Sequence, residues 1–150
     1  MSTITIRQAA LADLDILSVL FDRYRQFYER DSDVAAARKF LLERFDRGES
    51  VAFIACEGST PVGFTQLYPS FSSVSLGRIY ILNDLFVSDG GRRKGVGMQL
   101  LQAAINFAAT VGAIRLSLST SCTNAIGQAL YEGQGWQRDD DFFYTYTIQR

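Results

Sequence analysis

The sequence predicts a single α/β domain, residues 1–150, built around a mixed β-sheet. Strand-like and helix-like segments follow one another along the whole chain in the order β-α-α-β-β-β-α-β-α-β-β. This order implies about seven strands and about four helices. No linker, repeat or low-complexity tract divides the 150 residues, a length that one domain can hold.

The first elements are predicted from hydrophobic periodicity. Alternation over 4–7 indicates an opening strand, and apolar residues at helical spacing over 11–28 indicate an amphipathic helix. A second helix is predicted over about 34–46, with Gly48 just past its end. The sequence therefore opens with one strand and two helices.

The middle of the chain reads as a hairpin followed by a long strand. Residues 51–57 and 62–68 are predicted strands joined by a turn over 58–61. The polar segment 69–73 is predicted to be a loop, and 79–87 a long apolar strand.

The last third continues the alternation. We predict a loop over 88–94, a helix over 96–110, a strand over 113–118, a short helix over 124–132, and a closing strand pair at Trp136 and 142–148. The run Asp139 to Asp141 is expected to be a solvated turn between those last strands, not a metal site.

Composition excludes several classes of function. The chain has 15 basic and 16 acidic residues, so neither nucleic acid nor a membrane surface would attract it. It has no apolar run that fits a signal peptide or a membrane span, so the expected location is cytoplasmic. It has no histidine, which excludes a Ser-His-Asp triad, and no metal site is expected.

The strongest motif is the hexapeptide Arg92-Arg93-Lys94-Gly95-Val96-Gly97, between an apolar strand and an amphipathic helix. The first N–H groups of a helix have no intrahelical acceptor, and glycines let an anion approach them closely. A pyrophosphate is the natural ligand. A Walker loop would need Lys after Gly95, and a dinucleotide fingerprint would need a small residue at Leu100. The alternative is a solvated basic turn.

The spacing Arg-x-x-Gly-x-Gly in this context resembles the acetyl-CoA signature of the GCN5-related N-acetyltransferases. The resemblance extends to Ala9-Ala10-x-x-Asp13, to the hairpin at 51–68 and to Asn124 with Tyr131-Glu132-x-x-Gly135-Trp136. Within that family, the stretch 79–87 looks most like the spermidine/spermine (diamine) branch. Gly127 departs from the pattern, because the family usually has alanine there.

This resemblance implies a fold, a reaction and a cosubstrate. The fold is the acyl-CoA N-acyltransferase fold, with a mostly antiparallel sheet, and the reaction moves acetyl from acetyl-CoA to a small-molecule amine such as a polyamine or amino acid. Many members dimerise, and the aromatic tail 142–146 is a candidate contact in a homodimer. The resemblance assigns acetyl-CoA contacts to Leu85, Phe86, Val87, Arg92, Arg93, Lys94, Gly95, Val96, Gly97, Met98, Asn124 and Tyr131.

The pair Asn83-Asp84 interrupts an apolar strand, which predicts a β-bulge of the kind found near active sites. Amine acetylation needs a proton acceptor, because an alkylammonium has a pKa near that of lysine, about 10. Asp84, directly or through a water, is the candidate base, with Asn83 as a weaker contributor. The freed N–H groups just beyond the break are a candidate oxyanion hole. Alternatively, Asp84 caps a turn or pairs with an arginine.

Tyr131 is the candidate general acid. A phenol can protonate a departing thiolate, and Asn124, seven residues earlier, shares its helix face. By resemblance Tyr131 matches the family's acid and Asn124 a pantetheine contact. The alternative is a core tyrosine. Cys122 has no histidine to activate it, so we expect direct transfer and a buried or semi-buried thiol.

The acceptor end is the least specified. Acidic and aromatic residues cluster where the first two helices meet, which would suit a cationic amine but also fits inward-packed rings and solvated acids: Tyr24, Phe27, Tyr28, Glu29, Asp31 and Asp33. Two other hypotheses stay open: acetylation of a protein or peptide amine, and a non-catalytic acyl-CoA sensor. The presence of Tyr131 argues against the sensor.

Overall fold

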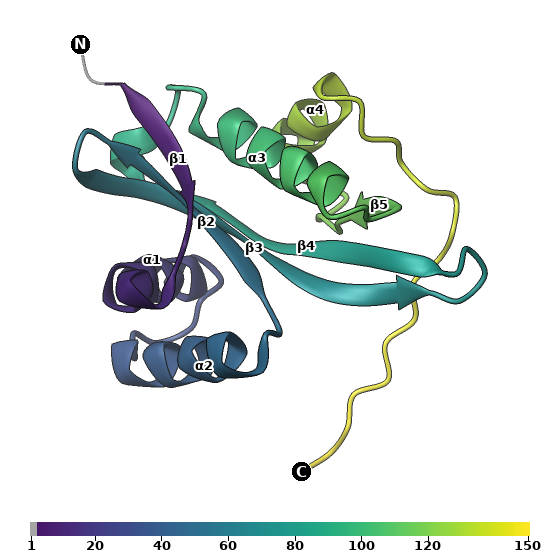
Figure 1. The fold of residues 1–150 in the computed structure, drawn as a ribbon, viewed down its shortest axis with the longest axis horizontal. Coiled ribbons are helices and arrows are strands. Elements are labelled where there is room, and N and C mark those ends of the chain that lie inside the picture. Colours follow the sequence, from purple (N-terminus) through teal and green to yellow (C-terminus); the bar gives the residue numbers. More distant parts are fainter. Residues whose placement is uncertain (1–2) are drawn as a thin grey trace. The chain divides into compact units, whose positions relative to one another are not determined.

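The strands of the sheet lie side by side in their order along the chain. In the computed structural model, which describes residues 3–150, the sheet order is β1-β2-β3-β4-β5 (Figure 1). The strands are β1 (Ile4–Gln8), β2 (Val51–Glu57), β3 (Thr60–Ser72), β4 (Gly77–Val87) and β5 (Arg115–Ser117). Neighbours are antiparallel except β4 and β5, which are parallel. The predicted mixed, mostly antiparallel sheet is confirmed, although it has five strands and not seven.

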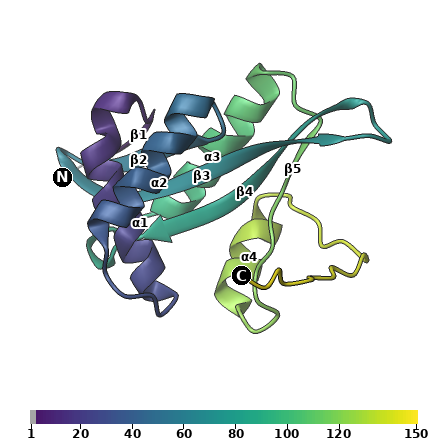
Figure 2. The same cartoon turned by 90° about the horizontal axis from the view of Figure 1, so that it is seen from below.

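Helices cover both faces of this sheet. They are α1 (Leu14–Phe27), α2 (Val34–Arg47) and α3 (Val96–Thr110), with α4 (Ala125–Gly133) further along the chain. α1 and α2 lie on one face and α3 on the other, as Figures 1 and 2 show. The chain divides into two compact units, Met1–Ser119 and Thr120–Arg150, and the sheet with α1, α2 and α3 belongs to the first.

The core between α1, α2 and the sheet explains why the predicted periodicities hold. Leu17 and Leu20 of α1, Leu41 of α2, and Ile54 and Phe64 of the sheet are almost fully buried and belong to one cluster. Each such side chain contributes about 1.5–3 kcal/mol by leaving water. The apolar stripes that the sequence shows are therefore the faces that meet here.

Polar contacts fix the ends of α1 and α2. Asp22, only 4% exposed, accepts hydrogen bonds from the Ser32 hydroxyl and the Asp33 N–H, both at 2.7 Å. The Asp33 carboxylate in turn caps α2 by accepting from the Ala36 N–H at 3.0 Å. Gly48 ends α2 in the left-handed conformation, with φ 62°, as predicted.

Two predicted segments differ in the structure. The segment 69–73, predicted to be a loop, continues strand β3 to Ser72, because its backbone pairs with β4 from Tyr68↔Ile81 to Ser72↔Gly77. The predicted closing strands at Trp136 and 142–148 are absent: in the described chain, β5 is the last strand. Strand propensity in 142–148 is not sufficient without a paired neighbour.

Candidate active site

A β-bulge in β4 stands at the centre of the candidate site. Gln66 of β3 pairs with Asp84, whereas the next residue, Leu67, pairs with Leu82, so Asn83 is an extra residue in β4. The predicted bulge at Asn83-Asp84 is confirmed. A bulge bends its strand and redirects the neighbouring side chains, which explains how a polar pair can interrupt an apolar strand.

Asp84 is a buried carboxylate held by amides. It is 1% exposed, and it accepts hydrogen bonds from Gln66 Nε2 at 2.6 Å and from Asn83 Nδ2 at 2.8 Å. Burial raises the pKa of Asp84, and hydrogen bonds from the Asn83 and Gln66 amides offset part of this rise. The partners are therefore neutral groups, and no arginine of the described chain forms an ion pair with Asp84.

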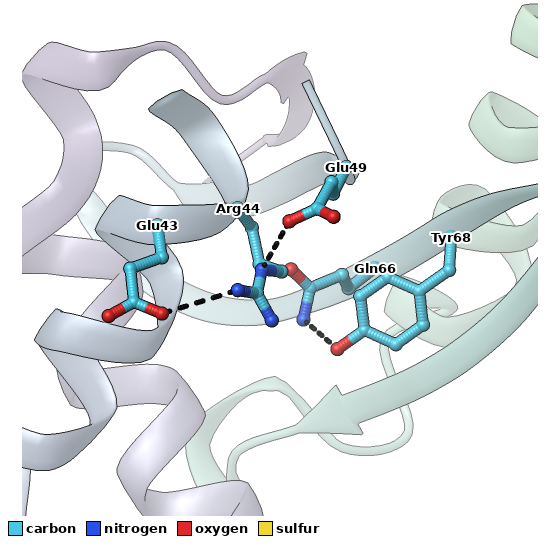
Figure 3. Close-up of polar contacts among 5 residues, drawn as sticks. All are labelled: Glu43, Arg44, Glu49, Gln66 and Tyr68. Atoms are coloured by element: carbon cyan, nitrogen blue, oxygen red, sulfur yellow. Dashed lines mark hydrogen bonds and ion pairs between the residues drawn. The ribbon is translucent and has the colours of Figure 1, made fainter. Parts of the chain in front are cut away.

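Two tyrosines flank this carboxylate. The Tyr24 hydroxyl donates to the Asn83 carbonyl at 3.3 Å, and the Tyr68 hydroxyl accepts from Gln66 Nε2 at 3.2 Å (Figure 3). Burial, and then the nearby Asp84 charge, raises the pKa of both phenols, so each stays neutral. Gln66 and Tyr68 were not among the predicted site residues, although a glutamine inside an apolar strand is a signal of the same kind as Asn83-Asp84.

A pocket of about 480 Å³ opens onto this group. Its lining comes from α1 and α2 and, on the sheet, from Tyr68 of β3 and the bulge residues of β4. The lining residues are Phe21, Tyr24, Arg25, Ala36, Ala37, Phe40, Tyr68, Asn83 and Asp84. A buried proton acceptor at the wall of a largely apolar pocket is an arrangement suited to taking a proton from a small bound molecule.

The predicted substrate cluster contributes one residue to this lining. Tyr24 lines the pocket, whereas Phe27 and Tyr28 are exposed. Asp33 is used as the cap of α2, and neither Glu29 nor Asp31 lines the pocket. The pocket therefore has one carboxylate, Asp84, and not an acidic rim.

The start of α3 has the features of an anion site. Its N-cap is Gly95, in the left-handed conformation with φ 74°, and no side chain caps the helix. The N–H groups of Val96 and Gly97 have no hydrogen-bond acceptor among the described residues. Because Gly95 has open space where a Cβ would stand, an anion can reach these groups, and the residues present fit the pyrophosphate of a CoA ester.

The three cations before α3 have different surroundings. Lys94 pairs with Glu57, its Nζ lying 2.9 Å from both carboxylate oxygens, and Arg92 pairs with Asp89 at 3.2 Å. Arg93 is exposed, in the left-handed region with φ 63°, and forms no ion pair within the described chain. Arg93 is therefore the cation most readily offered to a phosphate, because the other two already face carboxylates.

The predicted contact strand, Leu85 to Val87, has one unshared edge. β5 pairs with β4 only along Ile79 to Ile81, so the following residues of β4 have β3 as their neighbour on one side and no β5 partner on the other. Leu85, Phe86 and Val87 are half-buried. Backbone groups on that edge are available to an extended ligand.

The unit Thr120–Arg150 contains the other predicted residues, Asn124 and Tyr131. Asn124 caps α4: its Oδ1 accepts from the Gly127 N–H at 3.1 Å, and its Nδ2 donates to the Thr120 hydroxyl at 2.9 Å. Tyr131 lies two turns on, with its ring 6.2 Å from that of Trp136. A Cβ at Gly127 would stand 2.9 Å from Asn124 Cγ, so an alanine here would require the Asn124 side chain to shift.

The structure corrects one further expectation. Cys122, expected to be buried or semi-buried, is exposed, because it lies in the polar turn that precedes α4. Across residues 3–150 no cluster of three or more His, Cys, Asp or Glu side chains has an arrangement that would hold a metal ion. None of the helices in that range combines the length and apolarity that a bilayer crossing requires.

Comparison with known proteins gives a consistent family. The acetyltransferase (GNAT) family matches residues 16–136. The "Uncharacterized N-acetyltransferase YhfO" of Bacillus subtilis (strain 168) is 48% identical over 139 residues, 93% of each chain. The crystal structure of a probable acetyltransferase superposes with a TM-score of 0.91 at 44% identity, covering 97% of this chain and 99% of the other.

A more distant solved structure shows the same fold. The aminoglycoside N-acetyltransferase AAC(6')-Iy in complex with CoA superposes with a TM-score of 0.81 at 20% identity, covering 98% of this chain and 96% of that one. The family match covers most of the chain and includes β4, the start of α3 and α4. The chain therefore belongs to the GNAT acetyltransferase family, and the protein is an acyltransferase enzyme.

Proposed function

We propose that this enzyme transfers acetyl from acetyl-CoA directly to the primary amine of a small molecule. The observation that carries the proposal is the buried carboxylate of Asp84, at a β-bulge and open to a pocket of about 480 Å³. A pocket of this size suits a small acceptor. We also propose that the chain is a single domain and that the protein is located in the cytoplasm.

Acetyl-CoA would be held by two parts of the Met1–Ser119 unit. The open helix start at Gly95 to Gly97 would bind the pyrophosphate, with Arg93 as the free cation. The unshared edge of β4, from Leu85 to Val87, would bind the pantetheine arm. The related aminoglycoside acetyltransferase was solved with CoA bound, which supports this choice of cosubstrate. When bound, acetyl-CoA supplies an activated acetyl thioester.

Different residues of the chain carry out the two proton transfers of the proposed reaction. Asp84, directly or through a water, accepts the proton that the ammonium must lose before it can attack. Backbone N–H groups beyond the bulge stabilise the developing negative charge on the carbonyl oxygen. Tyr131 donates a proton to the departing thiolate, and Asn124 contacts the pantetheine arm. No acyl-cysteine is formed, because the chain has no histidine to activate a thiol.

An assay that measures the release of free CoA thiol tests this proposal. Purified protein with acetyl-CoA is screened against polyamines, amino acids, aminoglycosides and lysine peptides, and acetylated products are identified by mass. Small amines are expected to be acetylated, and exclusive acetylation of peptides would favour a protein acceptor. Acetyl-CoA binding without turnover of any amine would identify an acyl-CoA sensor.

Gly97→Val tests the cosubstrate site separately. Gly97 is not among the glycines with positive φ, so valine does not strain its backbone, whereas Gly95 needs its left-handed φ and would confound the test. The valine side chain would occupy the anion's place, and acetyl-CoA affinity measured by calorimetry is expected to fall below detection. Val111→Ala, at the end of α3, is a control that leaves binding unchanged. Native affinity in folded Gly97→Val would remove this turn from the site.

We also propose that two copies of the chain associate through the aromatic segment 142–146. Phe142, Phe143, Tyr144 and Tyr146 are all exposed, and exposed aromatic runs favour association. Sedimentation equilibrium of the native protein and of a Phe143→Ser variant would test it. A native protein that sediments as a monomer at all concentrations would contradict it.

A further inference from the structure

The pocket beside Asp84 contains a guanidinium with no anionic partner. Arg25 of α1 lines the pocket and is half-buried, and its side chain forms no ion pair or hydrogen bond within residues 3–150. The nearby Arg44 is different, because it lies 3.4 Å from Glu43 and 3.3 Å from Glu49 (Figure 3). Arg25 is therefore the cation of this pocket that a ligand can pair with.

The charges that line the pocket are one cation and one buried carboxylate. Asp84 faces the acceptor amine in the proposed function, and no second acidic side chain lines the pocket to receive another ammonium. A polyamine would place its second positive charge in a pocket that already holds the Arg25 cation, and like charges repel. An acceptor that carries an anionic group near its amine would instead pair both of its charges.

Apart from Asn83 and the hydroxyls of Tyr24 and Tyr68, the rest of the lining is apolar or aromatic. Phe21 stacks on Phe40 at 5.7 Å and on Tyr24 at 6.2 Å between ring centroids, so α1 and α2 present a continuous aromatic wall. Ala36 and Ala37 leave room beside it. This wall suits an apolar or aromatic side chain on the acceptor. A phosphate, with nearly two charges, would need more than the single cation that the lining offers.

From these three features we propose that the acceptor is an amino acid with a free carboxylate and an apolar or aromatic side chain. Its ammonium loses a proton to Asp84, its carboxylate pairs with the Arg25 guanidinium, and its side chain packs on Phe21 and Phe40. This inference rests on the proposed function. It departs from the expected diamine acceptor, because a diamine has no group for Arg25.

The experiment compares matched acceptor pairs that differ only in the carboxylate: phenylalanine with phenethylamine, tyrosine with tyramine, and leucine with 3-methylbutylamine, alongside spermidine. For at least one pair, native kcat/KM is expected to be about 10- to 100-fold higher with the carboxylate, the usual scale of a charged hydrogen bond. Arg25→Gln is expected to remove that preference by lowering the amino-acid value alone. Arg25→Lys should restore part of it, because the charge returns without the bidentate geometry.

Arg23→Gln is the matched control, since Arg23 is an exposed arginine of the same helix that does not line the pocket. It should leave both members of each pair unchanged. The inference is overturned if the amines or spermidine are the better acceptors, or if Arg25→Gln lowers both members equally. Those results leave the proposed function intact, whereas no CoA release with any amine would overturn both.

Discussion

Asp84 combines two properties that oppose each other in a folded protein. Its burial raises its pKa, which disfavours the charged form, yet its proposed role as proton acceptor requires the charged form. The Asn83 and Gln66 amides reduce this conflict by donating to its two oxygens. Asn83 is the extra residue of the bulge, so the irregularity in β4 provides one of the hydrogen bonds that lower the pKa of Asp84.

Asp84→Asn is expected to lower kcat/KM by about 10²–10⁴-fold, the usual scale for a positioned base. In the native enzyme, activity should rise with pH as Asp84 loses its proton, at a higher pH than for an ordinary aspartate, because its pKa is raised. The ratio of native to variant activity should show this rise. Asp46→Asn, at an exposed position of α2, is the control. A pH-independent ratio would remove Asp84 as the base.

The same variant should be more stable at neutral pH. Because the pKa of Asp84 is raised in the folded state, the unfolded state loses the proton first as pH increases. The free energy of unfolding therefore falls between the unfolded and folded pKa values, and the whole penalty is present above both. An asparagine at this position has no such penalty, so the Tm of the Asp84→Asn variant should equal or exceed the native Tm at pH 7. A lower Tm would show that the lost hydrogen bonds outweigh the charge.

Tyr131 allows a separate prediction, since phenylalanine keeps the ring and removes the hydroxyl. If the hydroxyl protonates the thiolate, Tyr131→Phe should lower kcat by roughly 10²–10⁴-fold with acetyl-CoA affinity nearly unchanged. If it instead satisfies a buried partner, stability should fall by about 1–3 kcal/mol with near-native kcat. Measuring kcat, affinity and Tm on one preparation separates the two. Tyr144→Phe, at a residue 92% exposed, is the control.

At the scale of elements, the connection between α1 and α2 positions two helices that line the pocket beside Asp84, the proposed acceptor site. Both helices line it, and the turn between them is fixed by Asp22, whose carboxylate accepts from Ser32 and from the Asp33 N–H. The pocket therefore depends on a contact that is not itself part of its lining. Mutations in this turn should affect the acceptor more than acetyl-CoA, because α3 is on the opposite face of the sheet.

Asp22→Ala tests this dependence. It leaves two donors without their acceptor, so urea unfolding should show a loss of about 1–3 kcal/mol, and KM for the acceptor should rise while acetyl-CoA affinity stays constant. Asp15→Ala is the control on the same helix, because its pair with Arg38 is exposed and is worth about 0–1 kcal/mol. Equal losses in the two variants would contradict this role for Asp22.

At the scale of the whole molecule, the candidate residues are divided between two units of the chain. Asp84, the α3 turn and the pocket belong to Met1–Ser119, whereas Asn124 and Tyr131 belong to Thr120–Arg150. The sequence predicts a single domain over residues 1–150. We therefore expect the two units to unfold together as one cooperative domain.

A comparison of two probes tests this cooperativity. Trp136 is the single tryptophan, so its fluorescence reports on the unit Thr120–Arg150, whereas far-UV circular dichroism is dominated by α1, α2 and α3. Coincident midpoints in urea are expected for two-state unfolding. A fluorescence transition at clearly lower urea would show that Thr120–Arg150 unfolds on its own.

The sequence by itself determined the features that are local along the chain. Helix periodicity predicted α1, α2 and α3 closely, because amphipathic stripes and caps lie within one segment. The polar pair Asn83-Asp84 inside an apolar strand predicted the bulge, and the glycine-rich turn predicted the open start of α3. These features depend on neighbours a few residues apart.

Only the tertiary structure decided the features that depend on distant partners. The continuation of β3 through 69–72 requires pairing with β4, and strand propensity in 142–148 found no partner strand. The hydrogen bonds of Gln66 and Tyr68 and the position of Arg25 in the pocket lining also come from the fold, because they depend on what lies across the sheet and the pocket. Burial and pairing between distant residues are properties of packing, and a sequence pattern does not contain them.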